Sequence, residues 1–298
     1  MVARVWRRPR RLLGAVAGAA VLVAVVLSAG RAWLPGAERD VTWERCRSEG
    51  VLRVGMDASY PPFEAVEGGE VRGLDVDLAH ELGRRLGLRP VFVNISFDGL
   101  YDALAAGRCD VLISALPYEG QRTPHVLYTG GYYNAGQVLV ARRGDARIKD
   151  YRDLGGRRVA VEMGSAAHQE ALRLRDREQI PLAVVAVESG ERALELVQSG
   201  DADAAIADSI TARLGLRVRQ GLALRGPALT DESYVIAVRR DSPELYAAIK
   251  GTLDGLRGEG WLEQLARRWL DGLTEEAAQP DTSWASAGDG NPTPDRGA

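Results

Sequence analysis

The sequence predicts an α/β protein with largely parallel sheets, and three observations lead to this fold class. Short apolar runs, typical of buried strands, alternate along the chain with helical patterns. Leucines recur every four residues from Leu74 to Leu86, which is the apolar stripe of an amphipathic helix. Residues 103–114 and 196–208, about ninety residues apart, share a pattern of helix end, glycine, aspartate and strand. This partial repeat favours two similar α/β lobes.

Each expected strand is a short apolar run bounded by turn residues or by a helical pattern. The runs lie at residues 51–55, 91–95, 110–114, 137–141, 158–162, 184–188, 204–207 and 234–238. Polar residues stand at or just after the ends of four of them: Asp57, Ser114, Ser165 and Asp208. Open α/β sheets bind ligands at the carboxyl ends of their strands. Two lobes with these ends facing each other would form one cleft.

The stretch GMDASYPPFE, Gly55–Glu64, follows the first apolar run. Pro61 and Pro62 fix their own φ and push the preceding residue towards extended geometry, so the segment is stiff. Tyr60 and Phe63 stand on either side of these prolines. The stretch is either a rigid turn or one wall of a binding site, and its position after a strand end favours the wall.

Composition excludes several classes of function. The chain has 298 residues, enough for two domains, and its 38 Lys and Arg nearly balance 41 Asp and Glu. No basic footprint indicates a nucleic-acid partner. His80, His125 and His168 are scattered without metal-ligand spacing, and the glycine-rich stretches lack the spacing of a phosphate-binding loop. We therefore expect no metal and no cofactor.

The two ends of the chain differ in composition from the rest. A basic cluster at 4–11 precedes an uncharged apolar run at 12–29, which is typical of an export signal. The run is nearly as long as the roughly 20 residues that span a bilayer, so an uncleaved anchor is favoured and cleavage near 30–32 stays open. We expect 1–35 to be this signal or membrane anchor, with the rest of the chain in the periplasm or at the cell surface. The polar segment 273–298 is expected to be disordered.

Cys46 and Cys109 are the two cysteines of a chain with an export signal. Each lies just before an apolar run, so both would sit at the N-terminal edge of one sheet if those strands are neighbours. In an oxidising compartment such a pair often bonds, and we hypothesise a disulfide. The alternative is two small buried apolar side chains.

A set of motifs between Trp43 and Asp271 carries a family resemblance. The motifs are RVGMDASYPPFE, VRGLDVDLAHELGRRLG, FDGLYDALAAGRCDVLISALPYEGQR, GGYYNAG, GSAAHQE, DADAAIADS and LRGEGWLEQLARRW. In this order and spacing they resemble the extracellular solute-binding protein family 3, the amino-acid-binding receptors of ABC importers. The resemblance implies a two-lobed, periplasmic-binding-protein-like fold of type II, with two crossing strands between the lobes.

The family organisation gives domain boundaries and partners. It implies one lobe built from 42–136 together with 233–272, and a second lobe built from 137–232. Closure of the two lobes would bury a small-molecule solute, a motion known for binding proteins. The closed monomer would then dock on an ABC permease in the membrane.

Family roles carry over first to residues of the first lobe. Tyr60 and Phe63 would pack on the ligand side chain as a rigid aromatic wall. Asp57 would meet a polar or cationic end, or it is only an Asx-turn residue. Arg122 would take the ligand α-carboxylate with two donors, or it is a solvated surface arginine. Further implied contacts are Ser114 and Ala115.

The second lobe supplies the other implied contacts. Gly164, Ser165 and Ala166 correspond to the start of a helix whose free backbone N–H groups suit an anion. Asp208 corresponds to the acid that pairs with the ligand α-amino group. Its alternative role is to cap the helix that follows it.

Two positions depart from the family pattern. Pro117 stands where a serine or threonine is usual and has neither a hydroxyl nor an N–H to donate. Glu119 replaces a second hydroxyl residue, and it would partly neutralise Arg122 if both point into the cleft. With Asp57, Glu119 and Asp208 as cleft candidates, a cationic ligand such as a basic amino acid or a polyamine is a reasonable hypothesis.

Three classes of function compete. A binding protein that leaves its solute unchanged is the prediction, and we expect no catalytic residue. An extracytoplasmic enzyme on the same fold, such as a dehydratase, is the main alternative, with Glu119 as the one acid or base to consider. Ser165 and His168 are interpreted as helix-start residues instead of a nucleophile and its base. A ligand-sensing domain that signals through a separate chain ranks third.

Overall fold

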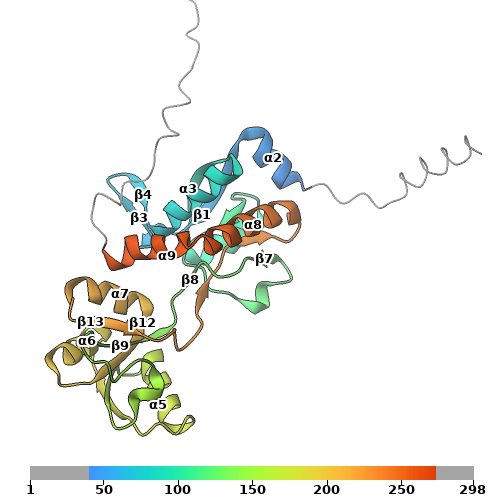
Figure 1. Ribbon diagram of the computed structural model, residues 1–298. Helices are drawn as coiled ribbons and strands as arrows, with labels where there is room; N and C mark the ends of the chain where they lie inside the picture. Colours follow the sequence, from blue (N-terminus) through green and yellow to red (C-terminus); the bar gives the residue numbers. More distant parts are fainter. Residues whose placement is uncertain (1–39, 273–298) are drawn as a thin grey trace, which may run out of the picture. The chain divides into compact units, whose positions relative to one another are not determined.

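The computed structural model describes residues 40–272 of the chain (Figure 1). The expected signal or anchor and the expected disordered tail both lie outside the described residues. Within 40–272, the helices are too short or too polar for any of them to cross a membrane. The predicted α/β class is observed, with two five-stranded sheets that each carry helices on both faces.

The first sheet has the strand order β5-β1-β6-β15-β7. Its strands are β1 (Val51–Met56), β5 (Arg89–Asn94), β6 (Val111–Leu112), β7 (Val126–Tyr128) and β15 (Ala237–Arg239). β1 runs parallel to β5 and β6, whereas β15 pairs antiparallel with β6 and β7. A small three-stranded sheet lies beside it in sequence, made of β2 (Ser59–Tyr60), β3 (Glu64–Glu67) and β4 (Glu70–Arg72). We call this part of the molecule lobe 1.

The second sheet repeats this arrangement with the order β11-β10-β12-β9-β13, and we call it with its helices lobe 2. Its strands are β9 (Gln137–Arg142), β10 (Arg158–Glu162), β11 (Ala183–Val187), β12 (Ala204–Asp208) and β13 (Leu222–Arg225). β10 is parallel to β11 and β12, and β9 is antiparallel to β12 and β13. In each sheet four strands therefore run in one direction, as expected for largely parallel sheets, and one strand, β15 or β9, runs against them.

The chain passes between the two sheets through a separate pair of short strands. β8 (Tyr133–Asn134) precedes the second sheet, and β14 (Ser233–Tyr234) follows it on the way back to the first. The two strands pair antiparallel, with Tyr133 opposite Tyr234. We call β8 and β14 the hinge strands.

Helices form from the patterns that predicted them. α3 (Leu74–Leu86) buries Leu74, Leu78 and Leu82, and it ends at Gly87, whose φ of +68° suits glycine. The other helices of lobe 1 are α2 (Val41–Glu49), α4 (Leu100–Ala105), α8 (Pro243–Gly258) and α9 (Trp261–Ala266). Those of lobe 2 are α5 (Ala166–Asp176), α6 (Gly190–Ser199) and α7 (Ser209–Val218). Short 3₁₀ or π turns complete the chain: η1 (Phe97–Gly99), η2 (Gly120–Arg122), η3 (Tyr151–Leu154) and η4 (Arg267–Asp271).

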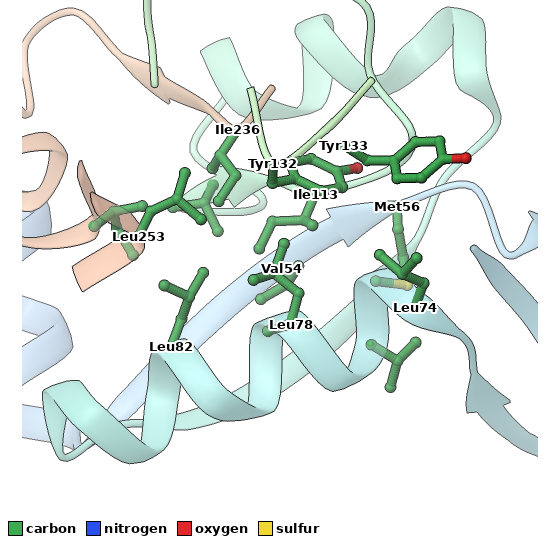
Figure 2. Close-up of a cluster of buried hydrophobic side chains, with 14 of the residues drawn as sticks. Val54, Met56, Leu74, Leu78, Leu82, Ile113, Tyr132, Tyr133, Ile236 and Leu253 are labelled. Carbon is green, nitrogen blue, oxygen red and sulfur yellow. The ribbon is translucent and has the colours of Figure 1, made fainter. Parts of the chain in front are cut away.

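Apolar side chains fill both faces of the first sheet. One cluster joins the sheet to α3, α8 and α9, and Figure 2 shows Leu78 and Leu82 of α3 beside Val54 of β1 in it. A second cluster contains Leu100 and Leu104 of α4 and covers the opposite face. This packing fixes the carboxyl ends of β1 and β6, where the predicted ligand residues begin.

The predicted disulfide is not formed, because both cysteines are free and buried. Cys46 belongs to the cluster with α3, whereas Cys109 belongs to the cluster with α4, so the sheet lies between the two thiols. Burial raises the pKa of Cys46 to about 12 and that of Cys109 to about 11, so both stay protonated near neutral pH. The alternative of two small buried side chains describes them correctly.

Candidate ligand-binding site

A cavity of about 460 Å³ opens at the carboxyl ends of β1 and β6 in lobe 1. It brings together five of the predicted residues, which lie in two separate segments of the sequence: Asp57, Tyr60, Ser114, Ala115 and Pro117. Four further residues of its lining were missed by sequence reasoning: Ser59, Glu64, Phe97 and Tyr234. The stretch Gly55–Glu64 is thus a wall of a cavity as well as a turn.

The carboxylate of Asp57 is held in place at this cavity. Its Oδ2 accepts a hydrogen bond from the backbone N–H of Phe97 at 2.7 Å, and its Oδ1 accepts one from Ser59 Oγ at 2.6 Å. Each carboxylate oxygen can accept a further bond. The bond to Ser59 is turn-like, so Asp57 takes the turn role and still offers its charge to the cavity.

Two half-exposed aromatic rings line the same cavity. Tyr60 is 45% exposed and Phe97 is 44% exposed, so both rings are open to a ligand in the cavity. The Tyr60 ring stacks on Phe63, with centroids 5.7 Å apart. An exposed ring beside a carboxylate is a surface that suits a cation.

Phe63 does not reach the cavity, which corrects its predicted role as a ligand contact. Its side chain is fully buried, and its ring packs edge-on against Tyr133 and Tyr234 at 5.3 Å each. Both tyrosines belong to the hinge strands. Phe63 therefore supports Tyr60 from behind and connects the aromatic wall to the hinge strands.

Ser114 and Ala115 form the floor of the cavity. Ser114 Oγ accepts from the backbone N–H of Asp57 at 2.9 Å and donates to Glu64 Oε1 at 2.7 Å. Ala115 has a φ of +41°, a conformation that costs a non-glycine residue roughly 1–2 kcal/mol. Its N–H donates to Asp75 Oδ2 at 2.6 Å, and this bond holds the strained residue in place.

Glu119 and Arg122 pair with each other away from this cavity. Arg122 Nε donates to Glu119 Oε2 at 2.9 Å, so the two side chains form an ion pair. The guanidinium lies 3.9 Å from the centroid of the Tyr101 ring, and Arg122 lines a different cavity together with His125 and Arg239. The structure therefore does not bring Arg122 or Glu119 to the residues around Asp57.

Pro117 lines the cavity beside the second hinge strand. It forms an isolated antiparallel bridge with Tyr234, and Val235 N–H donates to the neighbouring carbonyl of Leu116 at 2.8 Å. As expected from its ring, Pro117 offers no donor to a ligand. Tyr234, whose side chain ends in a hydroxyl, also lines the cavity beside Pro117.

The predicted residues of lobe 2 lie at the starts of two helices. Ser165 caps α5, where its Oγ accepts from His168 N–H at 3.2 Å, and Gly164 N–H donates to His168 Nδ1 at 3.1 Å. Asp208 caps α7 by accepting from Ile210 and Thr211 N–H at 3.1 and 2.8 Å. Ala166 is the first residue of α5. Both capping roles are confirmed, and neither helix start lines the cavity around Asp57.

A family model that describes bacterial extracellular solute-binding proteins, family 3, matches residues 52–272. The chain belongs to this family. Within this family it is 31% identical over 231 residues to the L-arginine-binding protein of Pseudomonas aeruginosa, covering 74% of this chain and 87% of that protein. It is 28% identical to the lysine/arginine/ornithine-binding periplasmic protein of Escherichia coli, with the same two shares covered.

Solved structures agree with the fold of this family 3 protein. An ancestral cationic amino acid solute-binding protein is 30% identical with a TM-score of 0.56, covering 77% of this chain and 99% of that one. The L-cystine solute receptor of Neisseria gonorrhoeae, in its unliganded open conformation, has a TM-score of 0.66 at 24% identity, over 77% of this chain and 96% of that one. The second likeness shows the two-lobed fold alone.

Proposed function

We propose that this family 3 protein is the extracytoplasmic receptor of an ABC importer and that its solute is a cationic amino acid such as arginine. The observation that carries the proposal is the cavity in lobe 1, where the Asp57 carboxylate is fixed beside the exposed rings of Tyr60 and Phe97. A guanidinium or ammonium group gains charge-assisted hydrogen bonds from the carboxylate and cation–π attraction from the rings.

The names of the relatives support a cationic amino acid. They include arginine-binding proteins of Pseudomonas aeruginosa and Escherichia coli and a lysine/arginine/ornithine-binding protein. The ancestral structure is also described as a cationic amino acid binder. The acidic and aromatic lining of the cavity is compatible with these solutes.

Lobe 2 would hold the other end of the solute when the lobes close about the hinge strands. The start of α5 presents the positive end of its dipole, which suits an α-carboxylate, and a bound carboxylate would compete with His168 Nδ1 for the N–H of Gly164. Asp208 is an acid at the end of β12 that suits an α-amino group. Because Arg122 is already engaged by Glu119, we assign the carboxylate first to the start of α5 and only second to Arg122.

The remaining parts of the proposal concern the setting of the receptor. Its partner would be a membrane permease, and it would act as a monomer tethered by the N-terminal apolar segment.

A binding protein returns its solute unchanged. Incubation with L-arginine followed by mass spectrometry should therefore recover only L-arginine, and a new product would favour the enzyme alternative.

The experiment that tests the proposed role of Asp57 is calorimetric titration of the full chain with L-arginine. Replacement Asp57→Asn keeps the size of the side chain and removes its charge, so affinity should fall about ten- to a hundredfold. The matched control is Asp98→Asn, an exposed acid next to Phe97 that does not line the cavity, which should change Kd less than about twofold. Equal Kd values for wild type and Asp57→Asn would contradict the cation-binding role of this residue.

A further inference from the structure

Two carboxyl groups are buried together at the cavity, whose lining includes one of them, Glu64. Glu64 on β3 is 1% exposed, and Asp75 in the first turn of α3 is fully buried. They bond to adjacent residues, Glu64 to Ser114 and Asp75 to Ala115, and each acts on the pKa of the other. Charged side chains are almost never buried without a partner, and the proposed ligand site does not use this pair as a direct contact.

The contacts of Asp75 are those of an ionised carboxylate. Its Oδ2 accepts two hydrogen bonds, from Ala115 N–H at 2.6 Å and from Tyr132 Oη at 2.8 Å. The residue also lies at the N-terminal end of α3, where the helix dipole favours a negative charge. Its second oxygen, Oδ1, has no donor among the described residues.

Glu64 likewise has one carboxyl oxygen with a partner and one without. Its Oε1 accepts from Ser114 Oγ at 2.7 Å, whereas its buried Oε2 has no partner within the described part of the chain. Two ionised carboxylates that share one buried site repel each other, so one of such a pair keeps a proton. A single proton on Glu64 Oε2, donated to Asp75, satisfies both unpartnered oxygens.

The surroundings favour this protonation state. Burial, and after it the charge of Asp75, raises the pKa of Glu64 to about 10, and burial raises the pKa of Asp75 to about 6. The other titratable groups that act on the pair are Asp57 and the phenols of Tyr132 and Tyr234, which carry no positive charge. The pair therefore titrates as a unit and holds one proton near neutral pH.

We propose that Glu64 and Asp75 share one proton and that this pair positions both the floor of the ligand cavity and the start of the first hinge strand. On one side the pair holds Ser114 and the strained Ala115. On the other side it holds Tyr132, the residue before β8, which Figure 2 shows among the buried side chains of lobe 1. The inference rests on the proposed function, because it concerns the regulation of the same site.

Binding should then depend on the number of protons in the pair. A second proton, taken up by Asp75, weakens the hydrogen bonds that Asp75 accepts from Ala115 N–H and Tyr132 Oη. Ser114 and Ala115 at the floor of the cavity are then held less firmly. The Kd for L-arginine should rise about tenfold between pH 7 and pH 5, since pH 5 lies about one unit below the pH at which Asp75 takes up this proton.

The first test needs no ligand. An infrared difference spectrum between the full wild-type chain and Glu64→Gln at pH 7 should show the C=O band of a protonated carboxylic acid in wild type only. Such a band reports a buried proton, which a merely structural role for two ionised acids would not produce. Its absence would overturn the proposal.

The second test is the Kd for L-arginine at pH 7 and pH 5 for three variants. Glu64→Gln should weaken binding at pH 7 less than Asp75→Asn does, because the neutral amide can donate to Asp75 and accept from Ser114. Asp75→Asn should bind at least about tenfold more weakly at pH 7 and lose the further weakening at pH 5. The control is Asp77→Asn on the same helix, a buried acid bonded to Trp269 Nε1, which should keep the wild-type pH profile.

Two results would contradict the positioning role. The first is that Glu64→Gln loses as much affinity for L-arginine as Asp75→Asn does. The second is that the Kd of Asp75→Asn still rises between pH 7 and pH 5 as it does in wild type. If wild type binds no L-arginine at any pH, the proposed function is wrong, which is a separate failure. The infrared band and the urea midpoints of the variants then decide on the pair. A shared proton predicts a near-normal midpoint for Glu64→Gln and a lowered one for Asp75→Asn.

Discussion

At the scale of single residues, the proton on Glu64 links stability to pH. The pKa of Glu64 is raised to about 10 in the folded chain, whereas a glutamate in an unfolded chain has a pKa of about 4.3. Between these values the folded state holds a proton that the unfolded state lacks. Unfolding therefore releases a proton, and raising the pH across this window lowers the free energy of unfolding.

Glu64→Gln should remove this dependence, because glutamine does not titrate. The free energy of unfolding of Glu64→Gln relative to wild type should increase by up to about 1.4 kcal/mol for each pH unit between pH 6 and pH 9. Urea denaturation of both chains at three pH values in this window measures the difference. Parallel pH profiles would show that Glu64 is not protonated in the folded state.

Part of the candidate site could be predicted from the sequence at this scale. Asp57, Tyr60 and Ser114 follow recognisable strand ends, and the sheet topology brings such ends together. Phe97 and Tyr234 come from segments that only the folded chain places beside them, so no local pattern marked them. Glu64 could have been noticed as an acid that directly follows a buried phenylalanine.

At the scale of elements, the start of α7 combines two roles in one residue. Asp208 caps the helix through the N–H groups of Ile210 and Thr211, and we propose that its charge also meets the ligand α-amino group. Asparagine caps helices about as well as aspartate does, but it carries no charge. The two roles can therefore be separated by one substitution.

Asp208→Asn should change the free energy of unfolding by only a few tenths of a kcal/mol while the affinity for L-arginine falls at least about tenfold. Asp208→Ala, which also removes the cap, should lose about 1 kcal/mol of stability in addition. Urea denaturation and calorimetric titration of the same three preparations measure both effects. Unchanged affinity in Asp208→Asn would reduce Asp208 to a helix cap.

The elements also show where sequence reasoning stops. The three mutually parallel strands of each sheet could be predicted from the alternation of apolar runs and helical patterns. Helix α3 could be predicted from its leucine stripe. The antiparallel strands β9 and β15 have the same apolar character as the others. Their direction is set where the chain passes twice through the hinge strands. The hinge strands pair residues about one hundred positions apart, such as Asn134 and Ser233, and no local sequence pattern predicts such a pairing.

At the scale of the whole molecule, the hinge strands connect the site in lobe 1 to lobe 2. Phe63 behind the aromatic wall packs on Tyr133 and Tyr234, and Tyr133 Oη lies 2.8 Å from Ser209 Oγ at the start of α7. In the proposed closure of the lobes on a solute, this aromatic contact would connect the site to lobe 2. Binding of a ligand to the folded chain alone must also raise its stability, by an amount set by ligand concentration and Kd.

The measurement that tests the central claim most directly is thermal unfolding of the full chain with single amino acids. L-arginine or L-lysine at about 100 times its Kd should stabilise the fold by about 2.7 kcal/mol, which raises Tm by about 5 °C or more. L-glutamate at the same concentration should leave Tm unchanged, because the cavity around Asp57 would repel its side chain. A Tm that responds to neither cation, or that rises with L-glutamate instead, would contradict the account of a receptor for cationic amino acids.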